Sequence, residues 1–109
     1  MSAADTYEVF AIRYACRQAQ RRDHFVGGDP HNADMPMDYF IWLIRNAERT
    51  LVVDTGFNAT MAAKRQRQLL RSPRDGLALL GVDSHTVQDV VITHMHYDHV
   101  GTFDEFPQA

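Results

Sequence analysis

Three histidines and one aspartate gather near the end of the chain, at His94, His96, Asp98 and His99. Imidazole nitrogens and carboxylate oxygens are ligands that zinc and similar divalent metals accept. Side chains on an extended strand alternate between two sides, so His94, His96 and Asp98 would point the same way. His99 breaks this alternation and joins the others only if the chain turns after Asp98, which Gly101 favours. The spacing predicts an extended segment that ends in a turn and brings these groups together.

Two other interpretations of the cluster are a helix and a group of structural or surface histidines without a metal. A helix would also bring His94 and Asp98 together, one turn apart, but the β-branched run just before His94 argues against a helix there. A lone histidine is usually a structural or surface residue, and we interpret the other histidines in this way: His24, His31 and His85. A buried cluster without a metal would crowd proton-binding groups at a cost in desolvation free energy. Metal binding is therefore the favoured interpretation.

Strands are predicted both at the cluster and earlier in the chain. The short β-branched run "DVVIT", residues 89–93, predicts the strand that leads into His94. Aromatic and β-branched residues predict three earlier strands, at 6–15, 37–45 and 51–55. The polar turn 46–50 indicates that the last two of these form a hairpin.

Helices and one long loop complete the predicted order. The segment "NATMAAKRQRQLLR", residues 58–71, predicts a helix that Asn58 or Thr60 caps and Pro73 stops. Residues 73–82 predict a second, short helix. Glycine, proline, aspartate and asparagine in residues 17–36 predict a long loop, and such loops often carry function. We expect mixed α and β structure without an internal domain boundary.

Composition narrows the class of protein. The chain has 109 residues and a net charge of −3, so it offers no basic excess for nucleic acid, which is not an expected partner. The longest apolar run, "YFIWLI", is too short to span a bilayer, and no signal peptide is visible at the start. Cys16 is the only cysteine, which excludes an intrachain disulfide and fits a reducing compartment. We expect a cytoplasmic location and no membrane association.

The motif resembles a known family. "HMHYDH", residues 94–99, follows an apolar strand, precedes Gly101 and is similar to the HxHxDH motif of the metallo-β-lactamase superfamily. The upstream "VVDTG", which contains Asp54, resembles the strand before the site in that superfamily. The runs "GDPHNADMPMDYFIWLI" and "GVDSHTVQDVVITHMHYDHVG" resemble its N-acyl homoserine lactonase-like branch. The resemblance covers the chain from about Tyr7 onward.

The resemblance implies a fold and its extent. The fold class would be α+β, as the N-terminal half of an αββα sandwich, with a mixed β-sheet and helices on one face. Residues 1–109 would then be the N-terminal part of a single domain whose C-terminal half is absent. A half-sandwich exposes an apolar sheet face and open edges, so we expect the chain alone to be poorly soluble or to self-associate.

The resemblance also implies roles for the site residues. His94 and His96 would bind one divalent metal ion, and Asp98 and His99 a second. A water or hydroxide between the metals would attack a substrate carbonyl, and Asp98 would act as a catalytic residue that handles a proton on the leaving group. Asp54 would orient the site through a ligand imidazole or the backbone, although a plain strand-end aspartate is a close alternative.

The cofactor expected from the resemblance is a pair of Zn²⁺ ions, although the same ligands accept iron, cobalt or manganese. Further ligands would lie on later strands, so the second site is incomplete in this chain. The implied substrate is a small-molecule lactone or related ester. Alternatives are a thioester or lactam hydrolase of the same fold, or a non-catalytic metal-binding module. We expect the chain alone to be inactive.

Overall fold

The computed structural model describes residues 5–109, whose strands form one mixed five-stranded sheet in the order β4-β1-β2-β3-β5. The strands are β1 (Glu8–Arg17), β2 (Met37–Arg45), β3 (Thr50–Val53), β4 (Gln68–Leu69) and β5 (Asp89–Val91). β3 and β5 are parallel, whereas the other neighbouring pairs are antiparallel. The predicted hairpin is confirmed, because β2 and β3 pair from Trp42↔Val53 to Arg45↔Thr50.

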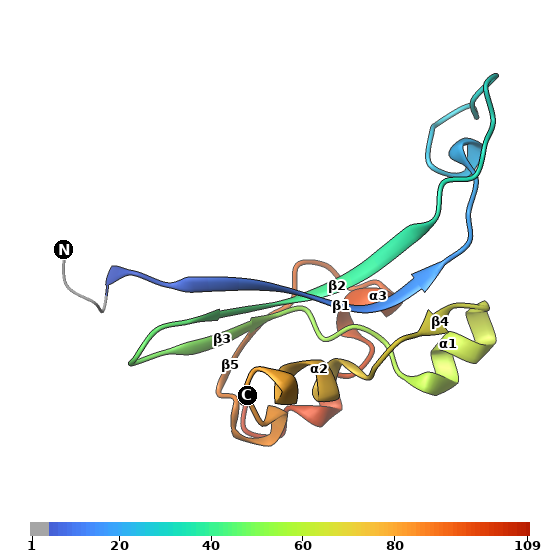
Figure 1. Ribbon diagram of the computed structural model, residues 1–109. Helices are drawn as coiled ribbons and strands as arrows, with labels where there is room; N and C mark the ends of the chain where they lie inside the picture. Colours follow the sequence, from blue (N-terminus) through green and yellow to red (C-terminus); the bar gives the residue numbers. More distant parts are fainter. Residues whose placement is uncertain (1–4) are drawn as a thin grey trace.

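The helices are short and lie on one side of the sheet, as Figure 1 shows for α1 and α2. Their bounds are α1 (Ala59–Arg65), α2 (Pro73–Leu79) and α3 (Tyr97–Val100). Asn58 caps α1 by accepting a hydrogen bond from the Met61 amide, and Ser72 caps α2 in the same way from the Asp75 amide. None of the helices in residues 5–109 is both long and apolar enough to cross a bilayer.

The two faces of the sheet have different surroundings. Side chains that alternate along each strand bury one face against the helices and leave the other exposed. The buried side includes Tyr14, Ile41, Leu43 and Val52, with Phe57 and Leu77 packed against it. The opposite face carries exposed apolar side chains, among them Val9, Phe40, Trp42 and Val91. We call these four the outer face. The predicted fold class is therefore confirmed: a mixed sheet with its helices on one face.

The predicted helix 58–71 is wrong in its second half. The helix ends when Gln66 adopts a left-handed conformation with φ of 58°. The chain then returns to the sheet, and Gln68 and Leu69 pair with Cys16 and Ala15 of β1. The unpaired edge of β1 offers backbone hydrogen bonds that helical periodicity alone could not reveal.

The predicted loop is confirmed as an arm, residues 18–36, that projects from the β1–β2 hairpin (Figure 1). Its contacts are local. Arg21 Nε lies 2.8 Å from Asp29 Oδ2, and the Arg21 amide donates to the Ala33 carbonyl at 2.8 Å. Phe25 and Val26 are exposed.

Candidate metal centre

The histidine motif lies in the segment that follows β5. The strand ends at Val91, and the short helix α3 begins at Tyr97 with His96 as its N-cap. The amides of His99 and Val100 both donate to the His96 carbonyl at 3.0 Å. The chain therefore turns earlier than the spacing predicted: not after Asp98 but before it. The turn places Asp98 and His99 together on one helical turn, where backbone hydrogen bonds replace an extended continuation.

The turn brings the predicted ligands together. Ligand atoms of His94, His96 and Asp98 all lie within 4.8 Å of one another. The His94 ring lies 4.5 Å from that of His96 and 3.8 Å from that of His99, measured between centroids. His99 Nε2 is 3.4 Å from Asp98 Oδ2. Asp98 therefore faces both the histidine pair and His99.

This donor set fits a divalent metal. Zinc binds nitrogen and oxygen ligands at about 2.0–2.2 Å, so donors around one ion lie up to roughly 4 Å apart. A small rotation of the exposed His94 and His96 side chains would bring the three donors into that range. Two imidazoles and a carboxylate also match the ligand preference of zinc and its neighbours.

Asp54 anchors this cluster from the end of β3. Its side chain is buried, with 3% of the residue exposed. One carboxylate oxygen accepts the Thr93 amide at 2.8 Å, and the Thr93 hydroxyl lies 2.9 Å from both oxygens. The other oxygen lies 2.7 Å from His99 Nδ1. The carboxylate thus joins the segment before His94 to the helix that carries His99.

Asp54 fixes which ring nitrogen of His99 carries a hydrogen. Burial raises the pKa of the Asp54 carboxyl, but the hydrogen bonds from the Thr93 amide and from His99 outweigh it, and the pKa lies below its ordinary value. An ionised carboxylate can only accept, so Nδ1 of His99 carries the hydrogen. The Nε2 lone pair of a neutral His99 is then free on the Asp98 side, as a metal ligand requires.

Thr55 holds the same helix through its backbone and Thr102 in turn holds Thr55; the sequence reasoning missed both. The Thr55 amide and hydroxyl donate to the His99 carbonyl at 2.7 and 3.1 Å. The Thr102 hydroxyl donates to the Thr55 carbonyl at 2.7 Å. Both threonines are buried, at 0% and 1% exposure. Only the position of Thr55 directly after Asp54 could have drawn attention to it.

Tyr97 lies under the motif and packs against the core. Its ring packs on Phe57 with centroids 5.6 Å apart, and the Arg65 guanidinium lies 3.8 Å above it. Its hydroxyl accepts from Arg67 Nε at 3.2 Å and lies 3.4 Å from the Tyr39 hydroxyl. Burial and this contact raise the pKa of Tyr39 to about 12. The ring therefore connects the motif to the aromatic core.

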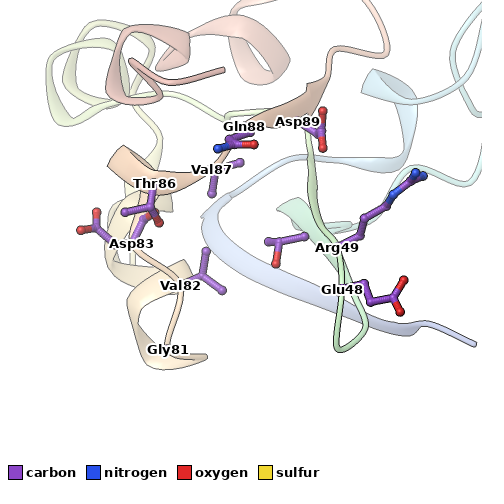
Figure 2. Close-up of a pocket in the computed structure, with 10 residues that line it drawn as sticks. Glu48, Arg49, Gly81, Val82, Asp83, Thr86, Val87, Gln88 and Asp89 are labelled. Atoms are coloured by element: carbon purple, nitrogen blue, oxygen red, sulfur yellow. The ribbon is translucent and has the colours of Figure 1, made fainter. Parts of the chain in front are cut away.

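A separate cavity of about 450 Å³ lies at the other end of β3 and β5 (Figure 2). The β2–β3 turn supplies Glu48 and Arg49 to its lining, and the segment before β5 supplies Asp83 and Gln88. Because β3 and β5 are parallel, this end is opposite the end that carries Asp54 and the histidines. None of the predicted site residues lines it.

Comparison with known proteins identifies the class. The sequence model of the Metallo-beta-lactamase superfamily matches residues 35–109. The chain therefore belongs to the metallo-beta-lactamase superfamily, and the predicted resemblance is confirmed. No curated protein sequence matched the chain.

Solved structures of N-acyl homoserine lactonases share this fold. The dizinc quorum-quenching lactonase AidC, bound to its product, superposes with a TM-score of 0.65 and 21% identity over 94% of this chain and 40% of AidC. A B. thuringiensis AiiA mutant with N-decanoyl-L-homoserine at its active site superposes with a TM-score of 0.63 and 15% identity over 90% of this chain and 44% of that one. An N-acyl homoserine lactone hydrolase with N-hexanoyl-L-homoserine at its catalytic metal centre superposes with a TM-score of 0.62 and 14% identity, over 92% of this chain and 44% of that one. The chain thus spans less than half the length of these structures.

Proposed function

We propose that this chain is the N-terminal part of a metal-dependent hydrolase domain that opens a lactone or a related ester. The observation that carries the proposal is the convergence of His94, His96 and Asp98, with ligand atoms within 4.8 Å, in a chain of this superfamily. Lactonase structures with the same fold support the substrate class, since one holds its product at a catalytic metal centre.

The proposed cofactor is a pair of divalent cations, with zinc as the first candidate. His94 and His96 would hold one ion, and Asp98 and His99 the other, because Asp98 faces both groups. When bound, such ions supply Lewis acidity that polarises a carbonyl and lowers the pKa of water to about 7. Among residues 5–109, His94, His96 and Asp98 are the one group of ligating side chains found close enough together for an ion.

The residues of the chain have separate tasks in this proposal. Asp54 holds the His99 ring in one orientation with Nε2 toward Asp98. The Asp98 side chain is 21% exposed, so its carboxylate can meet a substrate as well as a cation. We assign Asp98 a proton transfer: its carboxylate would take the proton that the attacking water loses and deliver it to the leaving oxygen, which must be protonated when an ester bond opens.

The ligands on this chain do not complete two catalytic sites. A catalytic zinc normally takes three protein ligands, and the four ligating residues must serve two ions. The remaining described histidines lie in the arm or beside α2: His24, His31 and His85. We propose that further ligands come from outside residues 1–109, and we expect the isolated chain to bind metal but to turn over substrate poorly.

The outer face supports a proposal about assembly. Trp42 and Phe40 are 40% and 38% exposed, with ring centroids 6.1 Å apart, and Val9 and Val91 extend the patch. Self-complementary apolar sheet faces pack well against one another. We propose that a second copy covers this face in the isolated chain. Sedimentation velocity should show a dimer that Trp42→Gln shifts to monomer, whereas a wild-type monomer at high concentration would contradict it.

The proposed activity is tested in the protein translated from the complete reading frame that contains these residues. Zinc-loaded protein is assayed with N-hexanoyl homoserine lactone, a glutathione thioester and a β-lactam. We expect lactone opening, and we expect Asp98→Asn to lower kcat by at least about 100-fold. Preferred turnover of the thioester or the lactam would change the substrate class, and absence of all three activities would leave a metal-binding module.

A further inference from the structure

Helix α3 is too short to satisfy its own backbone. The last four carbonyls of any α-helix have no partner within the helix, and α3 has only four residues, Tyr97–Val100. The His96 carbonyl accepts from two amides of the helix. The carbonyls of Asp98 and His99, which belong to two predicted ligands, need donors from elsewhere.

Two elements far away in the sequence supply those donors. Thr55, just after β3, donates its amide and its hydroxyl to the His99 carbonyl. Tyr14 of β1 donates its hydroxyl to the Asp98 carbonyl at 3.1 Å, across a separation of 84 residues. Each ligand residue on the helix is therefore held by its own buried donor.

The position of Tyr14 depends on an irregularity in β1. The register shifts between Arg13, which pairs with Phe40, and Ala15, which pairs with Tyr39. A bulge of this kind redirects a side chain, and here it buries both Tyr14 and Ala15 completely. The Tyr14 carbonyl meanwhile accepts the amides of Leu70 and Arg71, so its backbone is held as well.

The path of the Tyr14 ring to the helix is closely fitted. The ring packs edge-on against Phe57, with centroids 5.1 Å apart. Gly56 leaves room for it, because a Cβ at Gly56 would lie 2.8 Å from Tyr14 Cζ. A phenol hydroxyl keeps its hydrogen at neutral pH, so the Tyr14 hydroxyl can donate to the Asp98 carbonyl.

We infer that Tyr14 is a positioning residue: its hydroxyl fixes the Asp98 backbone and thereby directs the Asp98 carboxylate toward the histidines. This inference rests on the proposed metal centre. An outer contact that orients a ligand typically changes metal affinity 10–100-fold when it is removed. Tyr14→Phe deletes the donor but keeps the ring, so its effect should appear in metal binding.

The test is a Co²⁺ titration of the 109-residue chain, followed by the visible ligand-field spectrum. Tyr14→Phe should raise the Co²⁺ dissociation constant about 10-fold and shift the spectrum. The matched control is Tyr39→Phe, which removes a buried hydroxyl that contacts the Tyr97 side chain but no ligand backbone. It should change the affinity less than about 3-fold and leave the spectrum unaltered. Far-UV circular dichroism checks that both variants fold.

A rescue variant separates the donor from the packing. With 4-aminophenylalanine at position 14, an N–H donor returns and wild-type affinity should return with it. Equal affinities and spectra for Tyr14→Phe and Tyr39→Phe would overturn the inference. A folded rescue variant that binds Co²⁺ about 10-fold more weakly than wild type would also overturn it. This comparison with wild type decides the matter even if Tyr14→Phe does not fold. A wild-type chain that binds no Co²⁺ would instead overturn the metal centre itself.

Discussion

Two aspartates, Asp54 at the metal centre and Asp29 in the arm, make similar contacts in very different surroundings. Each accepts a backbone amide and a nitrogen of a basic side chain: Asp54 from Thr93 and His99, Asp29 from His31 and Arg21. Asp54 is buried, and its partners lie 39 and 45 residues away. The partners of Asp29 lie only 2 and 8 residues away; its own side chain is 11% exposed and that of Arg21 is 43% exposed.

The difference shows what makes a group of polar residues a rigid site. The contacts of Asp29 are with residues of the same arm, so they hold the arm in shape without joining it to another element. At the metal centre, buried contacts instead join β1, β3 and α3, through Tyr14, Asp54 and Thr55. Removing one partner there leaves a buried polar group without a hydrogen bond, which costs free energy. Regions with few buried contacts open at lower free energy. We therefore expect the metal centre to resist local opening and the arm to open readily.

Among the variants that test this contrast, Gly101→Ala should have the largest effect on the free energy of unfolding. A Cβ at Gly101 would lie 2.5 Å from the Tyr97 carbonyl oxygen and 2.6 Å from that of Gly56. Overpacking against backbone on both sides should destabilise the chain by about 3 kcal/mol, measured by urea denaturation. In the arm, a Cβ at Gly27 meets nothing within 4 Å, although φ is +82°. Gly27→Ala should cost about 1 kcal/mol, and equal costs would remove the contrast.

Asp54→Asn should have the next largest effect. The amide keeps the size of the side chain but loses the charge that orders His99, and it places an N–H donor opposite other donors. We expect a loss of about 2 kcal/mol in the free energy of unfolding and a change in the ¹⁵N shifts of the His99 ring. Asp29→Asn is the control and should leave global stability unchanged. Unchanged His99 shifts in Asp54→Asn would show that the carboxylate does not set the tautomer.

Thr55→Val tests the backbone contact alone. The valine keeps the shape but removes the hydroxyl that donates to His99 and accepts from the Thr102 amide. We expect destabilisation of about 1 kcal/mol. Thr86→Val removes a similar hydroxyl contact with a carbonyl, that of Asp83, but on the surface and only three residues away. Its effect should stay within about 0.5 kcal/mol, and a larger loss there than at Thr55 would contradict the comparison.

The smallest effect should appear as a pH dependence of the arm. The His31 amide, and then Arg21, hold the pKa of Asp29 below its ordinary value of 3.8. A lowered pKa means that the ionised carboxyl stabilises the arm above pH 3.8 and that this contribution is lost as the pH falls through the folded value. Protection of the His31 amide, relative to the intrinsic exchange rate at each pH, should fall over that range, in Asp29→Asn less than in wild type. Protection of the His31 amide that stays constant as the pH falls would contradict this.

The sequence predicted β1, β2, β3 and β5 because local patterns specify them, whereas the fold class followed from the family resemblance. The alternation in β2 and β3 and the polar turn between them needed no knowledge of distant residues. The motif residues were visible because His94 to His99 are close in the sequence. The position of the turn at Tyr97, by contrast, depends on His96 accepting two amides, which no spacing rule revealed.

The parts that could not be predicted depend on partners far away. β4 forms because β1 has a free edge, so residues 68–69 look helical until β1 is in place. The sequence pattern predicts Tyr14 only as one more residue of the first strand. The register shift in β1, which the pattern does not reveal, directs its hydroxyl to Asp98. Thr102 gave no signal at all, since its role is to bind the Thr55 backbone.

The most direct test of the central claim is the zinc content of the purified 109-residue chain after equilibrium dialysis against zinc, measured by elemental analysis. In the isolated chain, where the second ion lacks ligands, His94, His96 and Asp98 together should hold close to one ion per chain. His96→Ala should lose it, whereas His24→Ala, which removes an arm histidine, should retain it. A wild-type chain with far less than one ion, or equal content in the two variants, would contradict a metal centre at the anchored motif.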